Sequence, residues 1–155
     1  MLKIIEIKQY DVVNGPGIRC SIWLSGCSNH CEGCWSPQTW NASKGNDFDL
    51  DKIISYITNK NIDGISILGG DPFYWLFQDN TKAKKELLSL FKACYNTKKP
   101  VWVWTGYNYE YLKEHFPEYL KYIDVIIDGK YDKTKRNLNL FWRGSENQRV
   151  IKLNH

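Results

Sequence analysis

The chain contains the stretch Gly26-Cys27-Ser28-Asn29-His30-Cys31-Glu32-Gly33-Cys34-Trp35 at residues 26–35. Its pattern Cys-x3-Cys-x2-Cys brings three thiolates, from Cys27, Cys31 and Cys34, onto one short loop. Thiolates are ligands for iron–sulfur clusters and for zinc. A four-iron cluster held by three cysteines keeps one iron open for chemistry, whereas a fully ligated metal is structural. The spacing therefore predicts a [4Fe-4S] cluster with an open iron, and it differs from the Cys-x2-Cys-x2-Cys-x3-Cys run of ferredoxins.

Zinc is the main alternative occupant of this loop. His30 or a further cysteine could complete a zinc shell. His30 directly precedes Cys31, however, and a side chain at this position is poorly placed to bind the same metal. A disulfide framework is the second alternative. The five cysteines are an odd number, and residues 1–8 alternate charged and apolar side chains as a strand does, unlike a secretory signal. We therefore expect a reducing, cytoplasmic location.

Size and composition predict a single domain spanning residues 1–155. Hydrophobic residues make up 43% of the chain, which is ordinary for a globular protein. The aromatic content of 15% is high, and it indicates either a core rich in large rings or a face that binds a partner. The net charge of +4 is compatible with an anionic substrate or partner. The longest apolar runs have the length of strands, so we expect no membrane-spanning helix and no membrane partner.

Short apolar runs alternate with helical patterns along the chain. We expect strands at 4–13 (an edge strand or hairpin), 19–24, 64–68, 101–104 and 123–127, helices at 49–59, 80–95 and 109–116, and an irregular strand within 138–153. This alternation predicts an α/β fold with a mostly parallel sheet. Four such units cannot close an eight-stranded barrel, so the sequence predicts an open, partial (β/α) barrel.

Ligands of parallel α/β sheets bind at the carboxyl ends of the strands. Four motifs of this chain follow expected strands: the cysteine loop, Gly69-Gly70-Asp71-Pro72, Thr105-Gly106-Tyr107 and Asp128-Gly129-Lys130. We expect them to surround one site. Taken singly, the Gly-Gly-Asp-Pro turn is more often a plain loop, and Asp128 and Lys130 could be solvated turn residues. Cys20 and Cys94 are expected to be buried apolar residues, and His115 a surface residue of a helix.

The cysteine loop resembles the signature of the radical S-adenosylmethionine (SAM) enzymes. Ahead of it, Asn14-Gly15-Pro16-Gly17-Ile18-Arg19 is similar to the Asp-Gly-x-Gly-x-Arg segment of glycyl-radical activating enzymes. After it, the stretch from Trp35 to Asn41 resembles the Asn-x-x-Thr-Trp stretch of the activating proteins of anaerobic ribonucleotide reductases, with Ser36 as a departure. The resemblance continues through residues 69–72, 104–107, 124–131 and 143–149, and so covers nearly the whole chain.

This resemblance implies a partial barrel of the radical SAM type that binds a [4Fe-4S] cluster and SAM. It assigns the cluster to Cys27, Cys31 and Cys34. It assigns cofactor binding to Gly33, Cys34, Trp35, Gly69, Gly70, Asp71, Asp128 and Lys130. The turn at Asp71, where the superfamily often has Glu, is implied to receive the SAM amino group, and Lys130 to face the SAM carboxylate. No catalytic side chain is expected beyond the cluster and the SAM site.

The implied reaction is reductive cleavage of SAM to methionine and a 5′-deoxyadenosyl radical, which then generates a glycyl radical on an anaerobic ribonucleoside-triphosphate reductase. The expected partners are the large subunit of that reductase and a one-electron donor such as a flavodoxin, without nucleic acid. A short open barrel has little chain left for a lid, which favours a protein substrate. Two alternatives remain open: a short small-molecule radical SAM enzyme such as a 7-carboxy-7-deazaguanine synthase, and a zinc-stabilised binding module. Arg143 and Arg149 could meet an acidic partner segment or belong to a solvated tail.

Overall fold

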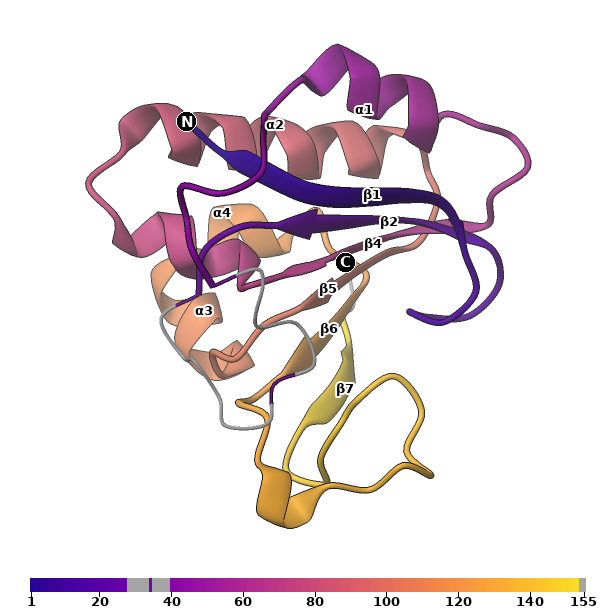
Figure 1. Cartoon of the computed structure of the whole chain (residues 1–155), viewed down its shortest axis with the longest axis vertical. Helices are drawn as coiled ribbons and strands as arrows, with labels where there is room; N and C mark the ends of the chain where they lie inside the picture. The colour runs from indigo at the N-terminus through magenta and orange to yellow at the C-terminus, as the bar shows by residue number, and fades with distance from the viewer. Residues whose placement is uncertain (28–33, 35–39, 154–155) are drawn as a thin grey trace.

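A computed structural model describes residues 1–27, 34 and 40–153 of the chain. Within this part, strands and helices alternate along the sequence (Figure 1). The elements are β1 (Lys3–Asp11), β2 (Arg19–Leu24), β3 (Asn46–Asp47), α1 (Leu50–Ile57), β4 (Gly64–Gly69), the 3-10 helix η2 (Pro72–Phe77), α2 (Thr81–Asn96), β5 (Val101–Trp104), α3 (Tyr109–His115), α4 (Pro117–Leu120), β6 (Val125–Asp128), the 3-10 helix η3 (Lys133–Lys135) and β7 (Arg149–Lys152).

One seven-stranded sheet has the order β3-β1-β2-β4-β5-β6-β7. Its four central strands, β2, β4, β5 and β6, are parallel, whereas β1, β3 and β7 pair antiparallel at the two sides. The expected α/β class is therefore confirmed, with parallel pairing confined to the central strands. In the described part of the chain the sheet is open and does not close into a barrel. The strand expected over residues 4–13 as an edge strand or hairpin pairs antiparallel with β2, the next strand along the chain. It does not lie at the edge of the sheet, because β3 pairs with its other side.

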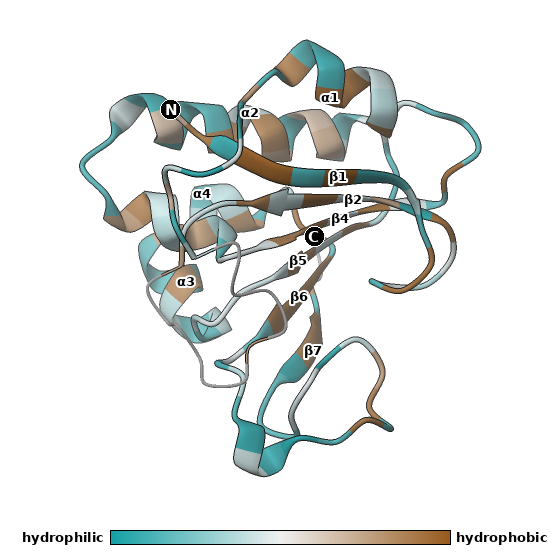
Figure 2. Cartoon of the chain, in the orientation of Figure 1, coloured by the Kyte–Doolittle hydropathy of each residue, from teal (hydrophilic) through white to brown (hydrophobic). Residues whose placement is uncertain are grey.

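The strands turn alternate side chains to the two faces of the sheet, as the twofold period of a strand requires. In β2, Cys20, Ile22 and Leu24 belong to the main apolar core, to which helices α1, α2, α3 and α4 also contribute. Figure 2 accordingly shows helices α1 and α2 with both hydrophobic and hydrophilic residues, while the stretch around η3 is hydrophilic. The opposite face of the sheet carries a second, smaller core built on Trp102 and Ile127. The helices therefore leave that second face available for a site.

Helices α1 and α2 each begin after a residue whose side chain caps the helix. The Asp49 carboxylate accepts a hydrogen bond from the Lys52 backbone N–H at 3.2 Å, and the Asn80 side chain accepts one from Ala83 N–H at 3.0 Å. The helix expected over residues 109–116 ends at His115, because Pro117 starts the separate helix α4. No helix in the described residues is long and apolar enough to cross a membrane.

Candidate functional site

Four turns lie at one edge of the sheet, because β2, β4, β5 and β6 run parallel. Leu24 at the end of β2 is paired with Gly69 at the end of β4, and Trp104 at the end of β5 with Ile127 in β6. The motifs expected to surround one site therefore do begin at a common edge.

The first turn leads into the cysteine loop. Cys27 is buried and Cys34 is half-buried, whereas Cys31, Gly33 and Trp35 lie outside the described residues. The start of the loop is fastened to the second turn, because Asp71 N–H donates to the Gly26 carbonyl at 2.6 Å. Among the described residues no three His, Cys, Asp or Glu side chains form a metal-binding group, since only two of the three loop cysteines belong to that set.

Cys20 and Cys94 differ from the loop cysteines. Both are fully buried in the main core, as expected from the sequence. Burial raises the pKa of the Cys20 thiol to about 11, and burial also raises the pKa of the Cys94 thiol. Both groups are therefore neutral thiols at physiological pH, which is unsuitable for a metal ligand.

A cavity of about 710 Å³ lies on the face of the sheet that the helices leave uncovered. Its floor consists of the strand residues Trp23, Leu68, Gly69 and Trp104, and Cys34 also lines it. Two loops and two single residues supply the remaining lining: 12–17, 140–144, Tyr131 and Gln148. Large apolar and aromatic side chains around a few polar groups are typical of a small-molecule site.

The loop at residues 140–144 is held against the sheet by two tryptophans. The Trp104 indole N–H donates to the Trp142 carbonyl at 2.7 Å, and the rings of Trp102 and Trp142 meet edge to face with centroids 4.9 Å apart. Trp142 itself has a φ of 63°, which is uncommon for a residue with a side chain. This loop was not among the residues expected to bind the cofactor. Trp102 and Trp104 alternate in β5 and therefore point to one face of the sheet, a signal that is visible in the sequence.

The loop at residues 12–17 is fixed by a buried carboxylate. Asp11 accepts hydrogen bonds from the Ser21 hydroxyl at 2.6 Å, the Asn14 amide at 2.7 Å and the Val13 backbone N–H at 3.0 Å. Burial tends to raise the pKa of Asp11, but these hydrogen bonds outweigh it and the pKa lies below its ordinary value. Asp11 is therefore ionised and anchors the loop over the cavity.

Arg19 ends the Asn14–Arg19 motif and is the first residue of β2. It also holds the loop at residues 12–17 in place. Its guanidinium donates to Ser66 Oγ at 2.8 Å, and Ser66 Oγ in turn donates to the Asn14 carbonyl at 2.6 Å. The group also lies 5.3 Å from the centroid of the Trp102 ring. Burial lowers the pKa of Arg19 to about 10, so it stays charged at neutral pH. The motif is thus a structural support of the cavity wall.

The second turn is built on Gly69 and Asp71. Gly69 has a φ of 151°, and a Cβ at this position would lie 2.3 Å from the Leu24 carbonyl oxygen. The Asp71 carboxylate is only 1% exposed and accepts hydrogen bonds from the Thr105 hydroxyl at 2.8 Å and from Gly106 N–H at 2.8 Å. Both residues therefore join neighbouring strands, a role that no local sequence pattern indicates.

The fourth turn places Asp128 and Lys130 in different surroundings. Asp128 is 1% exposed and accepts from Tyr109 N–H at 2.8 Å and from the Arg149 guanidinium, so the interpretation of Asp128 as a solvated turn residue is wrong. Lys130 is exposed and lines a neighbouring cleft of about 470 Å³ together with Gly106 and Tyr107 of the third turn. The third and fourth turns therefore share this cleft.

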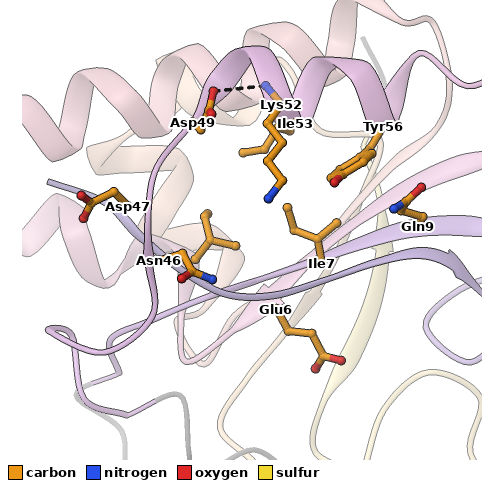
Figure 3. A pocket seen from close by; sticks show the side chains of 10 residues that line it. Glu6, Ile7, Gln9, Asn46, Asp47, Asp49, Lys52, Ile53 and Tyr56 are labelled. Atoms are coloured by element: carbon orange, nitrogen blue, oxygen red, sulfur yellow. Dashed lines mark hydrogen bonds between the residues drawn. The ribbon is translucent and has the colours of Figure 1, made fainter.

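A further small cleft, of about 170 Å³, lies between β1 and α1 (Figure 3). Ile7, Ile53 and Tyr56 form its apolar part, and Lys52 reaches toward strand β1. None of the residues expected to bind cofactor lines it. It is therefore separate from the candidate site.

Similarity to known proteins identifies the family of this chain. The family model described as "4Fe-4S single cluster domain" matches residues 13–151, which favours an iron–sulfur cluster over zinc. The chain is 43% identical over 143 residues to the "Anaerobic ribonucleoside-triphosphate reductase-activating protein" of Enterobacteria phage T4, covering 90% of this chain and 87% of the relative. Proteins of the same name from Vibrio cholerae and Escherichia coli K12 are 40% and 38% identical, with 89% and 90% of this chain and 90% and 92% of the relatives covered. The chain therefore belongs to the family of anaerobic ribonucleoside-triphosphate reductase-activating proteins, within the 4Fe-4S single cluster domain family.

Proposed function

We propose that this chain is a radical SAM activating enzyme that generates a glycyl radical on an anaerobic ribonucleoside-triphosphate reductase. The proposed unit is one radical SAM domain over residues 1–155, with the open sheet as a partial barrel. The observation that carries the proposal is the convergence of four turns at one sheet edge, next to a cavity that contains both Cys34 and Gly69. The names of the relatives supply the substrate class.

Cys27, Cys31 and Cys34 would hold the [4Fe-4S] cluster. The described part of the loop fits this role: Cys34 faces the cavity, and the Gly26 carbonyl is tied to Asp71 N–H, which fixes the loop beside the Gly69 turn. Cys20 and Cys94, as buried neutral thiols, offer no competing ligand set. Gly33 and Trp35 are proposed to flank the cofactor from the same loop.

Residues of the other turns would bind SAM. Gly69 and Gly70 present backbone without an obstructing Cβ, which suits close approach of a ligand. Because the Asp71 carboxylate accepts hydrogen bonds from the next turn, we propose that Asp71 shapes the Gly69–Gly70 backbone and that carbonyl groups of this turn receive the amino group. Asp128 and Lys130 are proposed to face the cofactor from the fourth turn, with the Lys130 ammonium toward the SAM carboxylate. When bound and reduced, the cluster and SAM together supply the radical that abstracts a hydrogen atom.

A protein substrate suits the rim of the cavity. Val12 and Val13 are each 72% exposed and Phe141 is 77% exposed, and all three line the cavity mouth. Exposed apolar side chains around a pocket mark sites of protein association. A reductase segment that covers this rim would complete the site and exclude water from it. The flavodoxin-like donor, the cytoplasmic location and the absence of nucleic acid or membrane partners remain predictions.

The test is to mix the anaerobically reconstituted protein, SAM, a one-electron reductant and the reductase, and to record the electron paramagnetic resonance spectrum. We expect a stable glycyl radical on the reductase. Omission of SAM, or replacement of Cys34 by Ala, should abolish the signal. The absence of a radical from the complete mixture would contradict the proposal.

Two alternatives give different outcomes in the same preparation. Efficient turnover of a nucleotide-like small molecule without the reductase would favour a small-molecule radical SAM enzyme. A colourless protein that retains zinc after anaerobic reconstitution with iron and sulfide would favour the zinc-stabilised module.

A further inference from the structure

Arg143, Gly144 and Gln148 of the segment Arg143–Arg149 line the candidate cavity, but no binding role has been assigned to the segment above. Its residues make a dense set of contacts. Arg143 donates from its guanidinium to the Gln148 carbonyl. The Gln148 side-chain oxygen accepts from Gly144 N–H at 2.8 Å and from Ser145 N–H at 3.1 Å. These bonds fold the segment onto itself and fix its last three residues in space.

Those last three residues contact the fourth turn one by one. The Asn147 amide donates to the Lys130 carbonyl at 2.7 Å, and the Gln148 amide donates to the Gly129 carbonyl at 3.0 Å. The Arg149 guanidinium donates from Nε to Asp128 Oδ1 at 3.0 Å and from Nη2 to Asp128 Oδ2. Each residue of the turn is therefore held by one residue of the segment, in antiparallel order.

Arg149 also reaches a second carboxylate. Its Nη2 donates to Glu110 Oε1 at 2.7 Å, and Glu110 lies in the first turn of α3, directly after Tyr109, whose N–H donates to Asp128. The side chain of Asp128 is 1% exposed, whereas that of Arg149 is 47% exposed. A buried carboxylate needs such a partner, because an unpaired charge in this position is costly. Arg149 thus connects β7 with the start of α3 and with the end of β6, two residues before Lys130 in the fourth turn.

We infer that Asn147, Gln148 and Arg149 form a bracket that positions Lys130, and that Arg149 is a positioning residue for the SAM-binding lysine. The inference rests on the proposed function, because it assigns Lys130 to the SAM carboxylate. Lys130 is exposed and has a flexible side chain, so its backbone position decides where the ammonium can reach. The bracket fixes the carbonyl groups of Lys130 and Gly129 directly, and thereby sets that position.

The experiment measures SAM affinity by anaerobic equilibrium dialysis of the cluster-loaded protein. Arg149→Lys keeps the charge and loses the two-pronged hydrogen bond to Asp128, so we expect SAM to bind about tenfold more weakly. Asn147→Ala removes one neutral hydrogen bond from an exposed residue, and we expect weakening of about threefold. Iron content should remain that of the wild type in both variants.

The deciding comparison is a double-mutant cycle with Lys130→Met. If the bracket acts through Lys130, Arg149→Lys causes no additional loss of SAM affinity in the Lys130→Met background. An equal loss in both backgrounds, or no loss in the wild-type background, overturns the inference. Lys152→Met is the control for the loss of a lysine. Lys152 lies in β7, the strand of Arg149, and pairs with Val125 at the other end of β6. SAM affinity should not change in this variant.

The cycle also separates this inference from the proposed function. A wild-type protein that carries its cluster and binds no SAM overturns both. A wild-type protein that binds SAM in a bracket-dependent way and forms no glycyl radical on the reductase supports the bracket and overturns only the activation of the reductase.

Discussion

Asp71 and Thr105 join the turns that follow β4 and β5: the Thr105 hydroxyl lies 2.8 and 3.1 Å from the two Asp71 carboxylate oxygens. Both side chains are buried, and Gly106 N–H donates to the same carboxylate at 2.8 Å. A fixed distance between the two turns needs such a link, because the turns follow separate strands. The relationship makes Asp71 a support of the site from within the protein.

Replacement of Asp71 by Asn should therefore destabilise the protein. The amide cannot accept all the hydrogen bonds that the carboxylate accepts, and we expect the free energy of unfolding to fall by about 1.5–3 kcal/mol. Urea denaturation under anaerobic conditions measures it. Asp79→Asn, at an exposed position next to η2, is the control and should change the free energy of unfolding by less than about 0.5 kcal/mol. Equal effects of the two substitutions would contradict the buried role of Asp71.

Replacement of Gly69 by Ala should disturb the junction of β2 and β4. The new Cβ would lie 2.3 Å from the Leu24 carbonyl oxygen, in addition to the cost of a φ of 151°. Gly129→Ala is the matched control, because its φ is 98° while a Cβ would meet nothing closer than 3.5 Å. We expect a larger drop in melting temperature for Gly69→Ala. A drop in Gly129→Ala as large as that in Gly69→Ala would show that the clash with Leu24 is relieved without cost.

The strands of the sheet could be predicted from the sequence, whereas the contacts between the turns could not. The strand Arg19–Leu24 and the strand Val101–Trp104 were predicted at their observed bounds, because buried parallel strands give short continuous apolar runs. The common edge followed from the parallel order. The Asp71–Thr105 link, by contrast, joins residues 34 positions apart, and a local pattern contains no information on such a pair.

The same limit applies to the tail of the chain. The irregular strand expected within 138–153 became the antiparallel strand β7, and only its register against β6 shows that Arg149 pairs with Asp128. Neither alternative considered for Arg149, an acidic partner segment or a solvated tail, included its pairing with Asp128 and Glu110 of the same chain. Strand β3 was missed because its two residues are too few for a periodic signal.

The cysteines should divide into two groups when each is replaced by Ala. Loss of Cys27, Cys31 or Cys34 should abolish iron and sulfide incorporation, because a cluster held by three thiolates loses a ligand. Cys20→Ala and Cys94→Ala should retain the cluster, since both thiols are fully buried in the core. Iron and acid-labile sulfide analysis after anaerobic reconstitution measures it. Retention of the cluster in Cys31→Ala, together with its loss in Cys20→Ala, would contradict the ligand assignment.

The buried thiol of Cys20 also gives a pH test of this division. Its pKa is raised from 9.0 to about 11 by burial, so the folded state favours the protonated form. This contribution to stability is fully present below pH 9 and is lost as the pH rises through about 11. The melting temperature of the wild type should therefore fall more steeply between these pH values than that of Cys20→Ala. Parallel curves would show that the Cys20 thiol does not differ from an exposed one.

The apolar rim should affect the reaction with the reductase alone. Phe141→Ser changes a residue that is 77% exposed at the cavity mouth, and we expect a higher reductase concentration for half-maximal radical formation, by about tenfold. SAM cleavage without the reductase should stay at the wild-type level. Leu138→Ser is the matched control, because Leu138 is 73% exposed, lies two residues before the loop at residues 140–144 and does not line the cavity. Equal behaviour of the two variants would exclude the rim as the reductase-binding surface.

The most direct measurement follows the hydrogen atom itself. The reductase is labelled with glycine that carries deuterium at Cα, and is mixed anaerobically with the cluster-loaded protein, SAM and a reductant. If the protein abstracts hydrogen from a glycine of the reductase, mass spectrometry of the 5′-deoxyadenosine product will find one deuterium atom in it, in an amount that matches the glycyl radical. Unlabelled 5′-deoxyadenosine, formed while the radical signal appears at full strength, would contradict direct abstraction by this protein.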